Sequence, residues 1–139
     1  MTFEEFVGLA ATVKAESDNL MDDGLIDEQK GLLEIIHTTI ERIDIFIWEL
    51  KQLKEDGEID TDHIDTSLAF DFRSPINNIY TACEYLLQPD LEWNHAALSK
   101  QQKATLLHIQ SAASQMMEYI FSVVQRQRQK YENRSKNSK

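Results

Sequence analysis

The sequence predicts an all-α protein in which long antiparallel helices form a helical hairpin or a four-helix bundle. The chain of 139 residues contains only 4 Gly and 2 Pro, so few residues interrupt a helix. Apolar residues recur every three or four positions in four successive segments, which is the spacing of a buried helix face. The connections between these segments are short, and short connections favour antiparallel neighbours.

The first predicted helix begins at Thr2, which forms a capping box with Glu5. We expect it to end at residues 22–24, because Gly24 suits the left-handed conformation that often closes a helix. Its expected buried stripe is Phe3, Phe6, Ala10, Val13 and Leu20.

The second predicted helix runs from about Asp27 to Asp56 and stops at Gly57. Further apolar residues widen its stripe, so we expect more than one face of this helix to be buried. The main stripe is Leu33, Ile36, Ile40, Ile43, Ile47 and Leu50, and the additional residues are Ile45, Phe46 and Trp48.

The third predicted helix starts near Asp60 or Thr61 and ends by Gln88, because Pro89 follows. Pro75 lies within it, and a proline inside a helix removes a backbone donor and kinks the helix. The expected stripe is Leu68, Phe72, Ile76, Ile79, Cys83 and Leu86.

The fourth predicted helix begins at a second capping box, formed by Ser99 and Gln102, and runs to about Tyr131. Its expected stripe is Leu106, Ile109, Ala113, Met116, Ile120 and Val123. The chain therefore divides into an N-terminal helical pair (1–57), a helical hairpin (58–131) and a basic tail (132–139), which we expect to pack as one structural domain.

Charge is distributed unevenly along the chain. The net charge is −10, yet residues 125–139 contain six basic residues and one acidic residue. This segment thus carries +5, which leaves −15 for residues 1–124. The acidic balance argues against a nucleic-acid partner. The basic end either contacts a partner or simply complements the negative end of the last helix dipole.

The sequence has neither the pattern of a secretory signal nor that of a membrane span, so we expect a cytoplasmic protein without a membrane partner. The acidic start, with Glu4 and Glu5, differs from the basic start of a secretory signal. The longest stretch without Asp, Glu, Lys or Arg is residues 104–117, and these 14 residues are too few to span a bilayer. The single cysteine, Cys83, excludes an internal disulfide and a thiolate metal cage.

Residues 69–79, Ala-Phe-Asp-Phe-Arg-Ser-Pro-Ile-Asn-Asn-Ile, resemble the signature of the dimerisation and histidine-phosphotransfer (HisKA) domain of sensor histidine kinases. That signature reads His-Glu-Leu-Arg-Thr-Pro-Leu. Asp71 matches its acid, Arg73 its arginine and Pro75 its kinking proline, and Ser74 stands where threonine is usual. The resemblance covers about residues 62–128 and implies a phosphotransfer-domain-like hairpin preceded by two extra N-terminal helices.

Two departures from this family shape the functional expectation. Phe70 occupies the phosphoacceptor position, and a phenyl ring has no nitrogen to phosphorylate. The chain also has no room for the ATP-binding domain of the kinases. The resemblance therefore implies a non-catalytic interaction or regulatory module of bacterial two-component signalling, which binds a response-regulator receiver domain or a histidine kinase and has no kinase activity of its own.

The resemblance also indicates which residues contact the partner. It implies that Phe70 points outward and that Phe70, Arg73 and Asn77 form the contact, although the N-terminal helices could instead cover Phe70. Asp71 and Ser74 match residues that assist phosphotransfer and dephosphorylation in the family, so an accessory phosphatase acting on a phosphorylated response regulator is an alternative. Alternatively, Asp71 is simply solvated and Ser74 bonds back to the preceding turn. A purely structural helical adaptor is the third functional possibility.

The histidines give weaker hypotheses. His63 lies seven residues before Phe70, which makes it a displaced phosphoacceptor candidate without the surrounding motif. At three places in the sequence, a carboxylate residue stands three positions before a histidine. Di-iron helical bundles use this spacing for their metal ligands. Only the first of these pairs lies well inside a helix, so we expect no metal site and no cofactor. The pairs are Glu34 with His37, Asp60 with His63, and Glu92 with His95.

Two arrangements satisfy the apolar stripes. In the family, two hairpins pair into a dimeric four-helix bundle, so the resemblance implies a homodimer. Alternatively, the first two helices fold back on the hairpin and complete a four-helix bundle within one chain.

Overall fold

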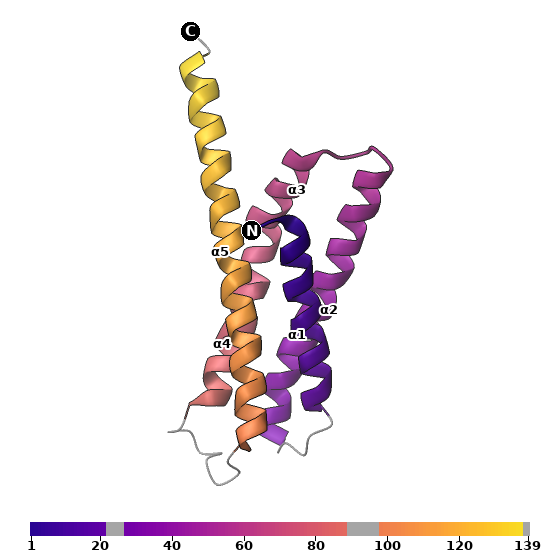
Figure 1. The fold of residues 1–139 in the computed structure, drawn as a ribbon, viewed down its shortest axis with the longest axis vertical. Coiled ribbons are helices and arrows are strands. Elements are labelled where there is room, and N and C mark those ends of the chain that lie inside the picture. The colour runs from indigo at the N-terminus through magenta and orange to yellow at the C-terminus, as the bar shows by residue number, and fades with distance from the viewer. Residues whose placement is uncertain (22–26, 89–97, 138–139) are drawn as a thin grey trace.

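The structure is a computed structural model that describes residues 1–21, 27–88 and 98–137. It is all-α, and its long helices run antiparallel in chain order (Figure 1). The expected C-terminal end of the first helix, at residues 22–24, and the pair Glu92 and His95 lie outside the described residues. The helical elements are α1 (Phe3–Met21), α2 (Asp27–Glu55), α3 (Thr61–Ser67), η1 (Leu68–Phe72), α4 (Arg73–Leu87) and α5 (Lys100–Asn137).

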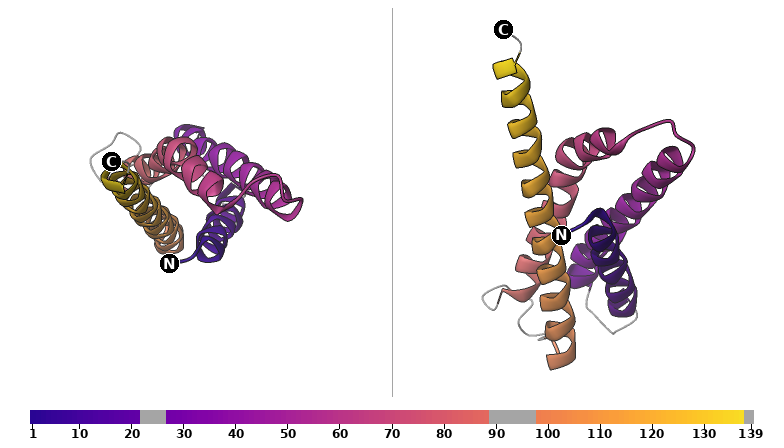
Figure 2. Two further views of the ribbon diagram at one scale, coloured as in Figure 1. Left: turned by 90° about the horizontal axis from the view of Figure 1, so that it is seen from above. Right: turned by 45° about the horizontal axis from the view of Figure 1, so that its top comes forward.

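The helices form a closed ring of neighbours around one core. α1 packs against α2 and α5, and α4 packs against the same two helices from the opposite corner. Figure 2 shows this four-cornered arrangement from above. α1 and α2 thus complete a four-helix bundle within a single chain, which is the second of the two arrangements that the stripes allow.

The predicted stripes form the core of this bundle. Every predicted position on α2, α4 and α5 is buried, as are the α1 residues from Phe6 onward, whereas Phe3 is only partly buried. The helix period therefore predicted the inward faces correctly. Burial also extends to polar side chains that the stripes omit, namely Ser17, Gln29, Asp65, Ser67 and Gln102.

The predicted helix boundaries follow from local hydrogen bonds. Thr2 Oγ1 accepts a hydrogen bond from the Glu5 N–H at 3.2 Å, as a cap should. Ser99 and Gln102 form both halves of a capping box, at 3.0 and 2.8 Å. Gly57, at φ +74°, closes α2 in the left-handed conformation that favours glycine.

The segment before Pro75 differs from the single kinked helix expected from the sequence. Residues 68–72 form a π-helical turn, η1, between α3 and α4. Pro75 lacks an N–H, and its ring crowds the carbonyl one turn earlier, so the regular α-helical pairing cannot continue through this point. A wider turn with i→i+5 bonds absorbs this disruption, and such turns are frequent at functional sites.

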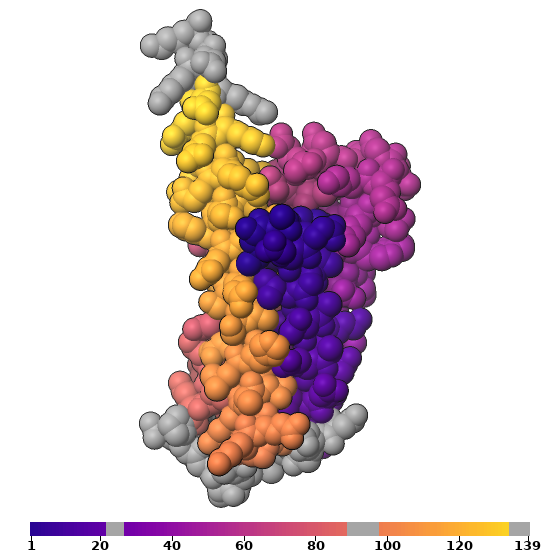
Figure 3. Space-filling model, viewed as in Figure 1, coloured from indigo at the N-terminus to yellow at the C-terminus, as the bar shows by residue number. Residues whose placement is uncertain are grey.

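Two of the basic side chains near the C-terminal end of the chain form ion pairs between α5 and α3. Lys130 Nζ lies 2.6 Å from Asp62 Oδ1, and an Arg126 amine lies 3.9 Å from Asp65 Oδ1. These two basic side chains of α5 therefore lie against acidic side chains of α3. This helix also continues to Asn137 rather than ending near Tyr131, and it extends beyond the other helices (Figure 3).

The prediction that α2 buries more than one face was wrong for two residues. Ile45 and Trp48 are 60% and 62% exposed, and Phe46 is 37% exposed. The ring of four helices covers only the main stripe of α2, so Ile45 and Trp48 face away from the core, whereas the partly exposed Phe46 ring still contacts Phe72. Within the described ranges, no helix is both long and apolar enough to cross a membrane.

Candidate functional site

The candidate residues lie on two different sides of η1 and α4. Phe70 is 78% exposed, although its neighbour Phe72 is buried. The alternative in which the N-terminal helices cover Phe70 is therefore wrong. α1 instead contacts Phe72, since the rings of Phe6 and Phe72 stack with centroids 6.0 Å apart.

Arg73 and Asn77 line a surface groove between α4 and α5. Asn77 lies in a hollow of about 400 Å³, and Arg73 borders an adjoining hollow of about 140 Å³. Met117 and Phe121 belong to both hollows, so they form one continuous apolar floor. We call this surface the α4–α5 groove; its lining residues are Arg73, Asn77, Tyr80, Ser114, Met117, Glu118, Ile120, Phe121, Val124, Gln125 and Arg128.

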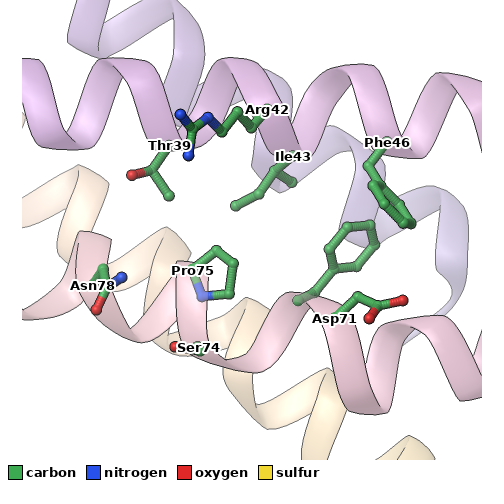
Figure 4. Close-up of a pocket in the computed structure, with 9 residues that line it drawn as sticks. Thr39, Arg42, Ile43, Phe46, Asp71, Ser74, Pro75 and Asn78 are labelled. Atoms are coloured by element: carbon green, nitrogen blue, oxygen red, sulfur yellow. The ribbon is translucent and has the colours of Figure 1, made fainter.

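Asp71 and Ser74 lie on the opposite side, in a groove between α2 and α4. Both side chains line this hollow of about 180 Å³, as the phosphatase hypothesis requires. Figure 4 shows Arg42 and Thr39 of α2 toward one end of the groove, with Asn78 across from them, and Asp71 toward the other end. We call it the α2–α4 groove; its lining residues are Thr39, Arg42, Ile43, Phe46, Asp71, Phe72, Ser74, Pro75 and Asn78.

An aromatic cluster supports η1 from inside the bundle. The Phe46 ring meets Phe72 edge-on at 5.2 Å, and Phe6 also contacts Tyr119 at 5.5 Å. The cluster therefore joins α1, α2, η1 and α5 at the level of the π-helical turn. Because the rings of Phe6 and Phe46 hold Phe72 from two helices, the backbone that presents Phe70 has a packed base.

Two buried groups have perturbed acidity. Burial raises the pKa of the Cys83 thiol to about 12, because the charged thiolate is poorly solvated there. Burial also raises the pKa of Tyr119, against a smaller opposing effect of the hydrogen bond with Arg126. Neither group borders either groove, so both belong to the core rather than to a reactive site.

Two histidine side chains, those of His37 and His108, form ion pairs or hydrogen bonds between helices. His37 Nε2 lies 2.5 Å from Asp18 Oδ1, and His108 pairs with Glu16, so both histidines bind α1 to a neighbouring helix. Asp60 caps α3 by accepting the His63 N–H at 2.9 Å. Among the described side chains, no group of three or more His, Cys, Asp or Glu residues could hold a metal ion.

The sequence did not indicate several of the residues that line the two grooves. Arg42 and Thr39 belong to a different helix from Asp71, so only the packing of α2 against α4 brings them together. Met117 and Phe121 could have been identified from the sequence, because they belong to a second stripe of α5 that lies next to its buried stripe. This second stripe is Leu107, Gln110, Ser114, Met117, Phe121 and Val124, with the same three-and-four spacing.

Comparison of the chain with protein-family models, with curated proteins and with solved structures finds no match in any of the three. The fold and the two grooves thus define the class of protein as an all-helical four-helix protein, in which α4 separates two surface grooves.

Proposed function

We propose that the chain is a non-catalytic interaction module of bacterial two-component signalling, which binds a receiver domain or a histidine kinase. The observation that carries the proposal is the exposure of Phe70. A phenyl ring that is 78% exposed on the π-helical turn, at the phosphoacceptor position of a HisKA-like motif, is typical of a contact residue.

The surroundings of Phe70 support a docking role. Arg73 and Asn77 follow it at positions i+3 and i+7 and line the α4–α5 groove, whose floor is apolar at Met117 and Phe121. An apolar floor with a polar rim has the composition of a protein–protein interface. Phosphotransfer through this position is excluded by chemistry, because the ring offers no nucleophilic atom.

The proposal predicts that binding depends on Phe70. Receiver domains and kinase hairpins from the same genome would be titrated calorimetrically against the full chain. Phe70→Ala is expected to weaken binding of the cognate partner about 30-fold or more, since central aromatic anchors contribute most of the affinity of an interface.

The matched control is Ile35→Ala, which removes another exposed apolar side chain from α2, away from η1. It should leave the affinity unchanged. A Phe70→His variant adds a second readout, because phosphorylation by a cognate kinase would show that the docking geometry persists. Failure of every receiver and kinase to bind the wild-type chain would contradict the proposal and favour a structural adaptor.

A second candidate function is an accessory phosphatase toward a phosphorylated response regulator. It is favoured by the α2–α4 groove, which the exposed side chains of Asp71 and Ser74 both line. Neither side chain makes a hydrogen bond or ion pair with another described residue, so both are available to a bound molecule. The expected backward bond from Ser74 to the preceding turn is likewise absent among the described residues.

This candidate predicts a shorter lifetime of the phosphoryl group. A receiver domain phosphorylated with acetyl phosphate and then freed of it would be followed with and without the chain. Wild type should accelerate dephosphorylation, and Asp71→Asn and Ser74→Ala should each remove most of the acceleration. An unchanged lifetime with wild-type chain at saturating concentration rejects the phosphatase and leaves the binding proposal intact.

A further inference from the structure

The α2–α4 groove contains polar groups that the folded chain does not use. Thr39, Arg42, Ser74 and Asn78 line it, and none of their side chains makes a hydrogen bond or ion pair with another described residue. Two apolar residues line the groove next to them, Ile43 on α2 and Pro75 on the facing helix α4 (Figure 4). Polar groups that converge next to apolar side chains are characteristic of a recognition site.

Charge indicates which chemistry the groove attracts. Four basic side chains of this acidic chain pair with carboxylates: Lys14 with Asp44, Lys51 with Glu4, Arg126 with Asp65 and Lys130 with Asp62. Arg42, like several other basic side chains, makes no such pair with another described residue, and it is the one basic side chain among those that line this groove. A guanidinium next to amide and hydroxyl groups is suited to a carboxylate, which it can bind through two parallel hydrogen bonds.

The size of the groove favours a segment of protein over a small molecule. Its volume of about 180 Å³ is below the roughly 300–1,000 Å³ of typical small-molecule sites and is close to that of one large apolar side chain. Ile45 and Trp48, both more than half exposed, lie within two turns of Arg42 on the same helix.

We propose that the α2–α4 groove docks a protein segment that inserts one apolar side chain over Ile43 and Pro75 and pairs a neighbouring carboxylate with Arg42. Asp71, at the other end of the groove, receives a basic side chain or N–H donors of the same segment. This surface lies on the other side of α4 from Arg73 and Asn77, so the inference does not rest on the binding function proposed for Phe70, and it assigns to the groove an occupant other than the phosphatase candidate's phosphorylated receiver.

The test uses displayed peptides of random sequence, selected against the intact chain. Sequences enriched on wild type should combine a large apolar residue with Asp or Glu within one helical turn. Synthetic copies of these peptides should bind Arg42→Glu at least about tenfold more weakly, because the charge-assisted hydrogen bonds are replaced by repulsion. Asn78→Phe, which fills the rim of the groove without changing charge, should weaken binding similarly.

The matched control is Arg128→Glu, which makes the same charge change in the α4–α5 groove. It should leave peptide affinity unchanged, as should Phe70→Ala. The proposal is overturned if the enriched peptides lack acidic residues or if Arg42→Glu binds them as wild type does. It is also overturned if Arg42→Glu instead dissociates a dimer of this chain, since the occupant would then be a second copy. Circular dichroism melting of each variant verifies that the fold is retained.

Discussion

Replacing Phe72 with alanine is expected to lower the free energy of unfolding by about 3–5 kcal/mol. Phe72 is 2% exposed, and its ring contacts Phe6 and Phe46 from two other helices. The substitution would leave a cavity at the point where the π-helical turn is held against the core. Urea unfolding followed by circular dichroism measures the change.

Phe70→Ala provides a closely matched control, because it removes the same ring two residues away. Phe70 is 78% exposed, so this variant should change the free energy of unfolding by no more than about 0.5 kcal/mol. Equal destabilisation by the two substitutions would contradict the orientation of η1 described above. The comparison also separates stability from binding, since only Phe70 is proposed to contact a partner.

The Cys83 thiol is expected to react with a disulfide reagent such as Ellman's at least about a thousandfold more slowly in the folded chain than in the unfolded one. Only the thiolate attacks the reagent, and burial raises the thiol pKa from 9.0 to about 12. The side chain is also fully buried, so the reagent cannot approach it without local opening. Absorbance at pH 8 in buffer and in concentrated guanidinium chloride measures both rates.

The same shift predicts how stability depends on alkaline pH. The folded state keeps the thiol protonated up to about pH 12, whereas the unfolded thiol loses its proton from about pH 9. The free energy of unfolding therefore falls as pH rises through this interval. Tyr119 contributes in the same direction, because its pKa is also raised. Cys83→Ala should show a smaller loss of stability over this interval than wild type, and an identical pH profile would contradict the assignment.

The inward faces of the helices were predictable because burial follows the helical period. Positions such as Ile40, Ile79 and Ile109 recur at three-and-four spacing, and they are fully buried. Capping residues such as Ser99 were predictable as well, since their hydrogen bonds involve only the next turn. Local chemistry and periodicity therefore determine most of the fold.

The candidate site was less predictable, since periodicity does not specify which helices become neighbours. Asp71 and Arg73 are two residues apart in sequence, yet they border grooves shared with α2 and α5 respectively. The exposure of Trp48 likewise depends on the ring of neighbours rather than on its own helix. Pro75 predicted a disruption of the helix, because it has no backbone N–H to donate. The lack of this donor does not reveal how the backbone around it rearranges.

The π-helical turn η1 interrupts the helical periodicity between α3 and α4. A π turn holds one residue more than the α-helical turn it replaces, and one residue corresponds to a rotation of about 100°. Residues before and after Leu68–Phe72 therefore follow different helical phases. His63 lies before the turn and Phe70 lies within it, so their spacing of seven residues does not place them on one face as it would in a continuous α-helix. Spacing rules for α-helices should accordingly be applied to Thr61–Ser67 and Arg73–Leu87 separately.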